Sequence, residues 1–274
     1  MHKEFLPTLS ILMEAKDKLD TEIMGKTAYM IFGLNLRSFI LPDKEICDSY
    51  LQNIINLTQN LLKANEHYRK YILEENLVIK EFREKNLKDS NINVNLTINP
   101  ISLLTEIEGL LTQLKAGLDT LAVSLNPILG LNLNGWHTEK NRSGAKVLKS
   151  LDNLSADLKI GVKPLYNFIE KNIEWLSYIV KLRDMPIHHG GIKSIIPILY
   201  DYQTTKVFPQ KIVHSQGFGD TEKIEMFLLR TIIEMTDFFH TVIVLSLQPR
   251  AHGLKVIPDI VGGIHSYSWG IPQP

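Results

Sequence analysis

An arginine and two histidines lie close together in the sequence Arg183-Asp184-Met185-Pro186-Ile187-His188-His189. The guanidinium of an arginine grips phosphate oxygens in a two-pronged fork and stays charged at any physiological pH. The imidazole of a histidine exchanges a proton near neutral pH. This pairing therefore predicts a site for phosphoryl chemistry, in which Arg183 neutralises the phosphate and His188 moves the proton.

The helix expected over residues 164–185 must position this arginine. Its apolar residues recur at steps of three and four and define one inward side: Leu165, Phe168, Ile169, Ile173, Leu176 and Val180. Arg183 is the next position on that side. A buried guanidinium is costly when unpaired, so we expect Arg183 to meet an acidic partner, an interface or an anion. Because Pro186 disfavours helical geometry at Met185, we also expect the helix to loosen there and His188 to swing toward Arg183.

The residues from Arg183 to His188 match the arginine, polar residue, short spacer and histidine of a known motif, and the chain resembles the HEPN superfamily over about residues 99–248. Domains of that superfamily are all-α, and many are metal-independent ribonucleases of toxin–antitoxin and anti-phage systems. The resemblance implies a homodimer in which two arginines and two histidines line one cleft. It also implies that Arg183 contacts the scissile phosphate, that His188 acts as general base or acid while the RNA 2′-hydroxyl attacks, and that Asp184 orients one of them.

Two functions follow from this resemblance. The first is an RNA endonuclease that needs no metal and no cofactor, with an antitoxin or another protein as a further partner. The second is a non-catalytic interaction module, whose cleft binds a nucleotide, RNA or a protein. Convergence of Arg183 and His188 in an open cleft would favour the nuclease, whereas a bond from Arg183 to a buried carboxylate would favour the module.

A second group of candidate RNA contacts lies in the polar loop expected over residues 130–144, which carries Trp136, Lys140 and Arg142. A base can stack on an indole ring while lysine and arginine hold the phosphates. The alternative is a solvated surface loop without a ligand. His189, beside the motif, is the remaining candidate RNA contact.

The composition narrows the functional classes. The chain has 274 residues, of which 44% are hydrophobic and 22% charged, and its formal net charge is zero. Proteins that bind duplex nucleic acid without sequence preference need surplus lysine and arginine, which this chain lacks. Its one cysteine, Cys47, excludes an intrachain disulfide and a cysteine-rich zinc site. The sequence contains no uncharged apolar run of about 18 residues, so no membrane span is expected. The first residues lack the apolar run of a signal peptide, so we expect a cytoplasmic protein.

The expected fold is an all-α, HEPN-like helical bundle with an N-terminal helical extension and a small strand-like insert near residues 194–216. An Asn-rich loop over residues 87–98 separates an N-terminal helical region, 1–86, from the HEPN-like domain, 99–248. The tail, 249–274, contains several prolines and glycines and is expected to be irregular. Further helices are expected over residues 4–26, 43–86, 145–159 and 221–247, the last capped by Asp220.

The most regular helix is expected over residues 99–125, where Asn99 and Pro100 suit the first two positions of a helix. Its apolar residues repeat every seven positions: Leu104, Ile107, Leu111, Leu114, Leu118, Leu121 and Leu125. Such a stripe packs lengthwise against another helix, either inside a bundle or across a dimer seam. Asn126-Pro127 is expected to end or kink this helix.

Overall fold

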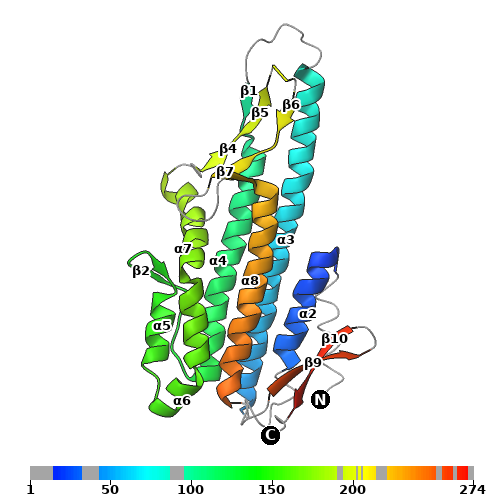
Figure 1. The fold of residues 1–274 in the computed structure, drawn as a ribbon. Helices are drawn as coiled ribbons and strands as arrows, with labels where there is room; N and C mark the ends of the chain where they lie inside the picture. Colours follow the sequence, from blue (N-terminus) through cyan, green and yellow to red (C-terminus); the bar gives the residue numbers. More distant parts are fainter. Residues whose placement is uncertain are drawn as a thin grey trace. The chain divides into compact units, whose positions relative to one another are not determined.

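A computed structural model describes residues 15–32, 43–86, 96–189, 194–201, 203–204, 206–213, 221–250, 255–261 and 264–270. Within these residues the chain is mainly helical, with seven α-helices and four small antiparallel sheets (Figure 1). The mainly helical fold expected from the sequence is confirmed. No helix in this part of the chain is both long enough and apolar enough to cross a membrane.

The chain divides into two compact units, and each unit is assembled from several segments of the sequence. Unit 1 takes its residues from 1–62, 116–177 and 236–274, and unit 2 takes its residues from 63–115 and 178–235. Four helices contribute one segment to each unit: α3 (Lys44–Asn86), α4 (Ile101–Leu129), α7 (Lys163–His189) and α8 (Ile224–Leu247). Each unit therefore contains residues that precede position 87 and residues that follow position 98.

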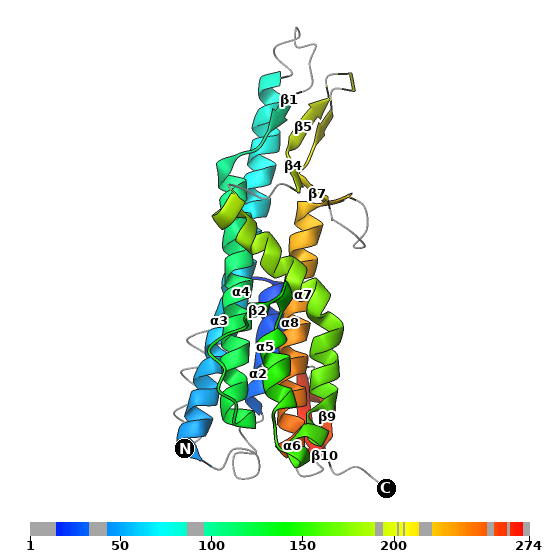
Figure 2. The ribbon, with the colours of Figure 1, turned by 90° about the vertical axis from the view of Figure 1, so that its left-hand side faces the viewer.

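Unit 1 is a helical assembly with two short hairpins. Besides its segments of the four long helices it contains α2 (Lys18–Phe32), α5 (Ala145–Asp152), α6 (Ala156–Gly161), β2 (Thr138–Glu139), β3 (Arg142–Ser143), β9 (Lys255–Val261) and β10 (Ile264–Gly270). Both views show α5 beside the first part of α7 (Figures 1 and 2). A buried hydrogen bond of 2.6 Å joins the hydroxyls of Thr27 on α2 and Thr58 on α3. This bond fixes α2 against the N-terminal part of α3.

Unit 2 contains the two three-stranded antiparallel sheets. One has the strand order β1 (Leu96–Ile98), β5 (Ile198–Asp201), β6 (Lys206–Phe208), and the other has the order β4 (Ile195–Ile196), β7 (Lys211–Val213), β8 (Thr221–Lys223). Leu199 lies opposite Phe208 in the first sheet, and Ile195 lies opposite Ile212 in the second. The insert expected near residues 194–216 is therefore present as the strands β4 to β7, and strands from outside that range complete both sheets.

A buried polar cluster connects this insert to α3 in unit 2. The Tyr71 hydroxyl donates to Glu75 Oε1 at 2.8 Å, and the backbone amide of Gln210 donates to the same oxygen at 3.0 Å. Gln210 Nε2 in turn donates to Asn99 Oδ1 at 2.8 Å. Gln210 has no exposed surface, and Glu75 is only 6% exposed. These bonds satisfy groups whose burial would otherwise be costly, so they fix the position of the insert.

The heptad stripe of α4 is buried within the chain. Of its seven residues only Leu104 is half-buried, and the others are at most 2% exposed. A stripe that is already covered by the chain's own helices offers no free seam to a second copy. Of the two interpretations of the stripe, the structure therefore supports the core helix of a bundle.

Both proline-containing helices run further than predicted. Helix α4 passes Pro127 and ends at Leu129, before Gly130 with its left-handed φ of 69°. Of the two outcomes predicted for Asn126-Pro127, an end or a kink, the end of the helix at that point is wrong. Pro127 has no backbone N–H, so α4 forgoes one hydrogen bond, to the carbonyl of Val123, two residues before the helix ends. The Asn126 side chain also secures this end, because it bonds both the N–H and the C=O of Leu133 at 2.8 Å.

Three other expectations need correction. The single helix predicted over 145–159 is two helices, α5 and α6, because Asn153 ends the first and Ser155 precedes the second. The last helix begins at Ile224 rather than at residue 221, because Thr221 to Lys223 pair with β7. The tail is not irregular over its described residues, since β9 and β10 form an antiparallel hairpin. The expected cap Asp220 and residues 1–14 lie outside the described part.

Candidate functional site

The candidate motif lies in the last turns of α7, within unit 2. The inward side of this helix is buried as predicted, with Leu165, Ile169, Ile173, Leu176 and Val180 each at most 5% exposed. Phe168 is half-buried. Arg183, the next position, keeps 30% of its side chain exposed. The guanidinium therefore lies at the edge of the buried side of α7, where solvent and solutes can reach it.

Arg183 has an acidic partner in the adjacent residue. Its Nη1 donates to Asp184 Oδ1 at 2.9 Å. The Asp184 side chain is 41% exposed, and ion pairs at such positions contribute only about 0–1 kcal/mol to stability. The Nε atom of Arg183 is buried and has no hydrogen-bond partner among the described residues. Asp184 therefore orients the guanidinium without using all of its donors.

The helix does not break before the histidines. Helix α7 stays helical through Pro186 to His189, so the prediction that it loosens after Met185 is wrong. Pro186 costs the helix one bond to the carbonyl of Leu182, and the helix ends three residues later. On a continuous helix, positions 183 and 188 point about 140° apart. One chain therefore does not bring these two positions to the same side of α7, and the side chains of 186–189 lie outside the described residues.

Trp136 is a core residue of unit 1 and not a surface platform. It has no exposed surface, and its backbone N–H donates to Asp119 Oδ1 at 2.7 Å. Its ring meets the ring of Phe238 edge-on, with 5.7 Å between the centroids. A Cβ on Gly144 would lie only 2.6 Å from the indole. The expectation that a base stacks on Trp136 is therefore wrong, because no face of the ring is accessible.

The two cations of the same loop do reach the surface. Residues 138–143 form the hairpin of β2 and β3, which turns through Lys140 and Asn141 with φ values of 49° and 64°, as two-residue hairpin turns require. Lys140 is exposed, and Arg142 is 54% exposed with a carboxylate oxygen of Glu170 at 3.7 Å. They belong to unit 1, whereas Arg183 belongs to unit 2. Of the predicted site residues, the described contacts bring together Arg183 and Asp184.

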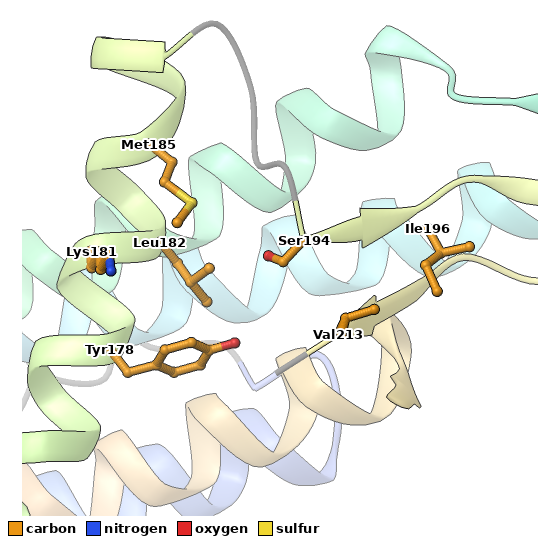
Figure 3. Close-up of a pocket in the computed structure, with 7 residues that line it drawn as sticks. All are labelled: Tyr178, Lys181, Leu182, Met185, Ser194, Ile196 and Val213. Atoms are coloured by element: carbon orange, nitrogen blue, oxygen red, sulfur yellow. The ribbon is translucent and has the colours of Figure 1, made fainter. Parts of the chain in front are cut away.

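A pocket that the sequence did not predict lies on another side of α7 in unit 2 (Figure 3). Its volume is about 450 Å³, and its lining combines α7 with the strands β4 and β7 and the residue before β4: Tyr178, Lys181, Leu182, Met185, Ser194, Ile196 and Val213. Tyr178, Leu182 and Met185 follow one another at steps of four and three, which places them on one side of the helix. Position 183 points roughly 100–160° away from each of them. The spacing of Tyr178, Leu182 and Met185 was the signal in the sequence that could have indicated a second functional side of α7.

No group of three or more histidine, cysteine, aspartate or glutamate residues in the described ranges is arranged to hold a metal ion. Comparison of the chain with protein-family models, with curated proteins and with solved structures finds no match.

Proposed function

We propose that this chain is a HEPN-like protein that binds the phosphate backbone of RNA at Arg183, and that two copies together form a metal-independent RNA endonuclease. The observation that carries the proposal is the state of Arg183. Its guanidinium is partly exposed, it is oriented by a surface carboxylate, and its buried Nε is without a partner among the described residues. A phosphate oxygen would satisfy that donor and gain a charge-assisted hydrogen bond.

The proposed reaction requires only these groups and the RNA itself. The 2′-hydroxyl attacks the adjacent phosphorus, and the bond from phosphorus to the 5′-oxygen breaks. The products are a 2′,3′-cyclic phosphate and a 5′-hydroxyl. Arg183 neutralises the charge that develops on the non-bridging oxygens, and Asp184 holds the guanidinium in place. His188 removes the proton of the 2′-hydroxyl, or protonates the leaving 5′-oxygen.

The proposal requires a second copy of the chain because α7 is helical from Arg183 to His188. Since the helix is continuous, Arg183 and His188 of one chain occupy positions about 140° apart around its axis. A two-fold pair of helices can place the arginine of one chain opposite the histidine of the other, because a symmetric interface brings the same residues together twice. The end of α7 is therefore the expected dimer contact.

Cleavage of a mixed RNA substrate in EDTA tests this function. We expect wild type to produce 2′,3′-cyclic phosphate ends, and we expect Arg183→Ala and His188→Ala to lose about 10²-fold or more of the rate. Arg83→Ala is the matched control, because Arg83 is an exposed arginine of α3 outside the proposed site and should keep the wild-type rate. Folded wild type that does not cleave RNA, or equal rates in all four proteins, would overturn the proposal.

A non-catalytic RNA-binding module is the second candidate, and the separation of positions 183 and 188 on one helix favours it. A single arginine binds a phosphate without a histidine beside it. Filter binding at several salt concentrations separates the two functions. If wild type binds RNA, Arg183→Ala weakens binding at every sequence and no cleavage occurs, the module is supported.

A further inference from the structure

The pocket beside α7 has an apolar wall and a few polar groups, which is the usual composition of a site for a small molecule. Leu182 and Met185 form the wall on the helix, and Ile196 and Val213 form the wall on the strands (Figure 3). Ile196 is 38% exposed and Val213 is 41% exposed. An apolar ligand would cover these two side chains and remove their surface from water.

Ser194 is the polar residue of the pocket wall that is best placed to bond a ligand. Its hydroxyl oxygen is buried and has no hydrogen-bond partner among the described residues. Its backbone carbonyl accepts the N–H of Val213 at 2.8 Å, so the backbone is fixed while the side chain stays unused. Buried hydroxyls in proteins are almost always bonded, and in Figure 3 this one is directed into the pocket. A polar group of a ligand would satisfy it.

Tyr178 supplies a second hydroxyl to the same space, as Figure 3 shows. Its ring is held edge-on against Phe227, with 6.4 Å between the centroids. Burial raises the pKa of Tyr178 to about 12, the nearby carboxylate of Glu222 raises it as well, and Arg230 lowers it. The phenol therefore keeps its proton at neutral pH and can donate to a ligand.

The charge at the pocket favours an anion. Lys181 is an exposed residue of the lining and contributes an ammonium group. The acidic neighbour of Tyr178 is Glu222, whose carboxylate is bonded to Arg230. Because Arg230 already neutralises Glu222, the charge of Lys181 is available to a negatively charged head group.

We propose that this pocket binds a small amphiphilic monocarboxylate. The apolar tail packs against Leu182, Met185, Ile196 and Val213. The carboxylate accepts hydrogen bonds from the hydroxyls of Ser194 and Tyr178, and Lys181 balances its charge. This site is separate from the proposed nuclease groups, since Arg183 lies on another side of α7 and the only motif residue in the lining is Met185, which belongs to the spacer.

Calorimetric titration with decanoate and with decanol, both below the concentration at which they aggregate, tests this site. Decanoate should bind wild type saturably and raise its melting temperature, and decanol should bind more weakly. Lys181→Met and Ser194→Ala should each weaken decanoate about tenfold, the loss expected for a hydrogen bond or ion pair to a charged group. Lys181→Met should leave decanol unchanged.

Val213→Trp should block both probes by filling the pocket, and Val213 is exposed enough to accept the larger ring without refolding the core. Lys149→Met, which removes an exposed lysine from α5, is the control and should bind as wild type does. The proposal is overturned if wild type binds neither probe. It is also overturned if folded Val213→Trp binds decanoate normally, or if decanol equals decanoate and Lys181→Met changes neither.

Discussion

Units 1 and 2 share four helices but differ in how completely each covers its own apolar side chains. Among the residues whose side-chain exposure is described, which leaves out 1–14, 28–42 and 250–274 of unit 1, the large, apolar and exposed residues of unit 1 are Ile46 and Ile160. In unit 2 there are seven such residues: Leu73, Leu77, Ile101, Ile196, Phe208, Val213 and Met226. Two of these seven residues, Ile196 and Val213, line the pocket beside α7.

The buried interiors of the two units contain different kinds of side chain. Aromatic rings pack together in the interior of unit 1, where the ring of Phe238 contacts four others: Trp136, Phe168, Trp175 and Phe239. Unit 2 buries the polar cluster of Tyr71, Glu75 and Gln210, and it also contains Arg183 and the pocket. Both proposed binding sites, at Arg183 and in the pocket, lie in unit 2.

The largest effect is expected for Trp136→Ala. Removing a fully buried indole from the aromatic core should lower the free energy of unfolding by about 3–5 kcal/mol. Lys140→Ala, in the same loop but exposed, should change it by less than about 0.5 kcal/mol. Urea denaturation of the two variants measures both values. Near wild-type stability of Trp136→Ala would contradict its place in the core.

Two leucines of α3 provide a matched comparison of the units. Leu61, in unit 1, is 1% exposed, and Leu77, in unit 2, is 55% exposed. Leu61→Ala should cost about 2–5 kcal/mol of unfolding free energy, because it leaves a cavity. Leu77→Ala should cost less than about 0.5 kcal/mol. Equal losses of unfolding free energy in urea denaturation would contradict the difference in burial between Leu61 and Leu77.

The polar cluster of unit 2 should make stability depend on pH. Burial raises the pKa of Glu75, against the lowering effect of its bonds from Tyr71 and Gln210. The folded state therefore holds a proton more tightly than the unfolded state, and this contribution is lost as pH rises from the ordinary glutamate pKa through the raised one. Glu75→Gln keeps the acceptor oxygen but cannot titrate. Its unfolding free energy should fall less over that range than the wild-type value.

A small effect is also expected for an ion pair at the surface of unit 1. Lys26 on α2 is bonded to Glu22 at 3.0 Å and to Asp237 on α8. Exposed ion pairs contribute about 0.2–1 kcal/mol and weaken in salt. Lys26→Met should lose no more than this at low ionic strength, and the difference from wild type should shrink in 1 M salt, where the Debye length is only about 3 Å. A loss of several kcal/mol would mean that α2 depends on this ion pair.

The long helices were predictable because apolar spacing records which side of a helix is buried. The stripes of α4 and α7 showed this clearly, and α3 occupies nearly the range expected for it. The prolines misled the prediction because sequence patterns do not show how near a helix is to its end. Pro127 and Pro186 each remove one backbone donor within the last turn of their helix, and both helices continue past them.

The candidate site was only partly predictable. The position of Arg183 at the edge of the buried side of α7 followed from the spacing, and so did its need for a partner. The burial of Trp136 did not, because its neighbours Lys140 and Arg142 suggested a surface loop, whereas Gly144 lets the indole pack into the core. The pocket was missed because it depends on Ser194 and Val213, which only the tertiary structure brings to α7.

Mixing Arg183→Ala with His188→Ala tests the two-copy nuclease most directly. In a mixed dimer whose sites combine the arginine of one chain with the histidine of the other, one site loses both groups and the other keeps both. Random exchange of subunits should therefore restore about a quarter of the wild-type cleavage rate in EDTA. Either variant alone should remain inactive. If cleavage requires both residues but the mixture stays as inactive as the single variants, the site lies within one chain and the two-copy account is wrong.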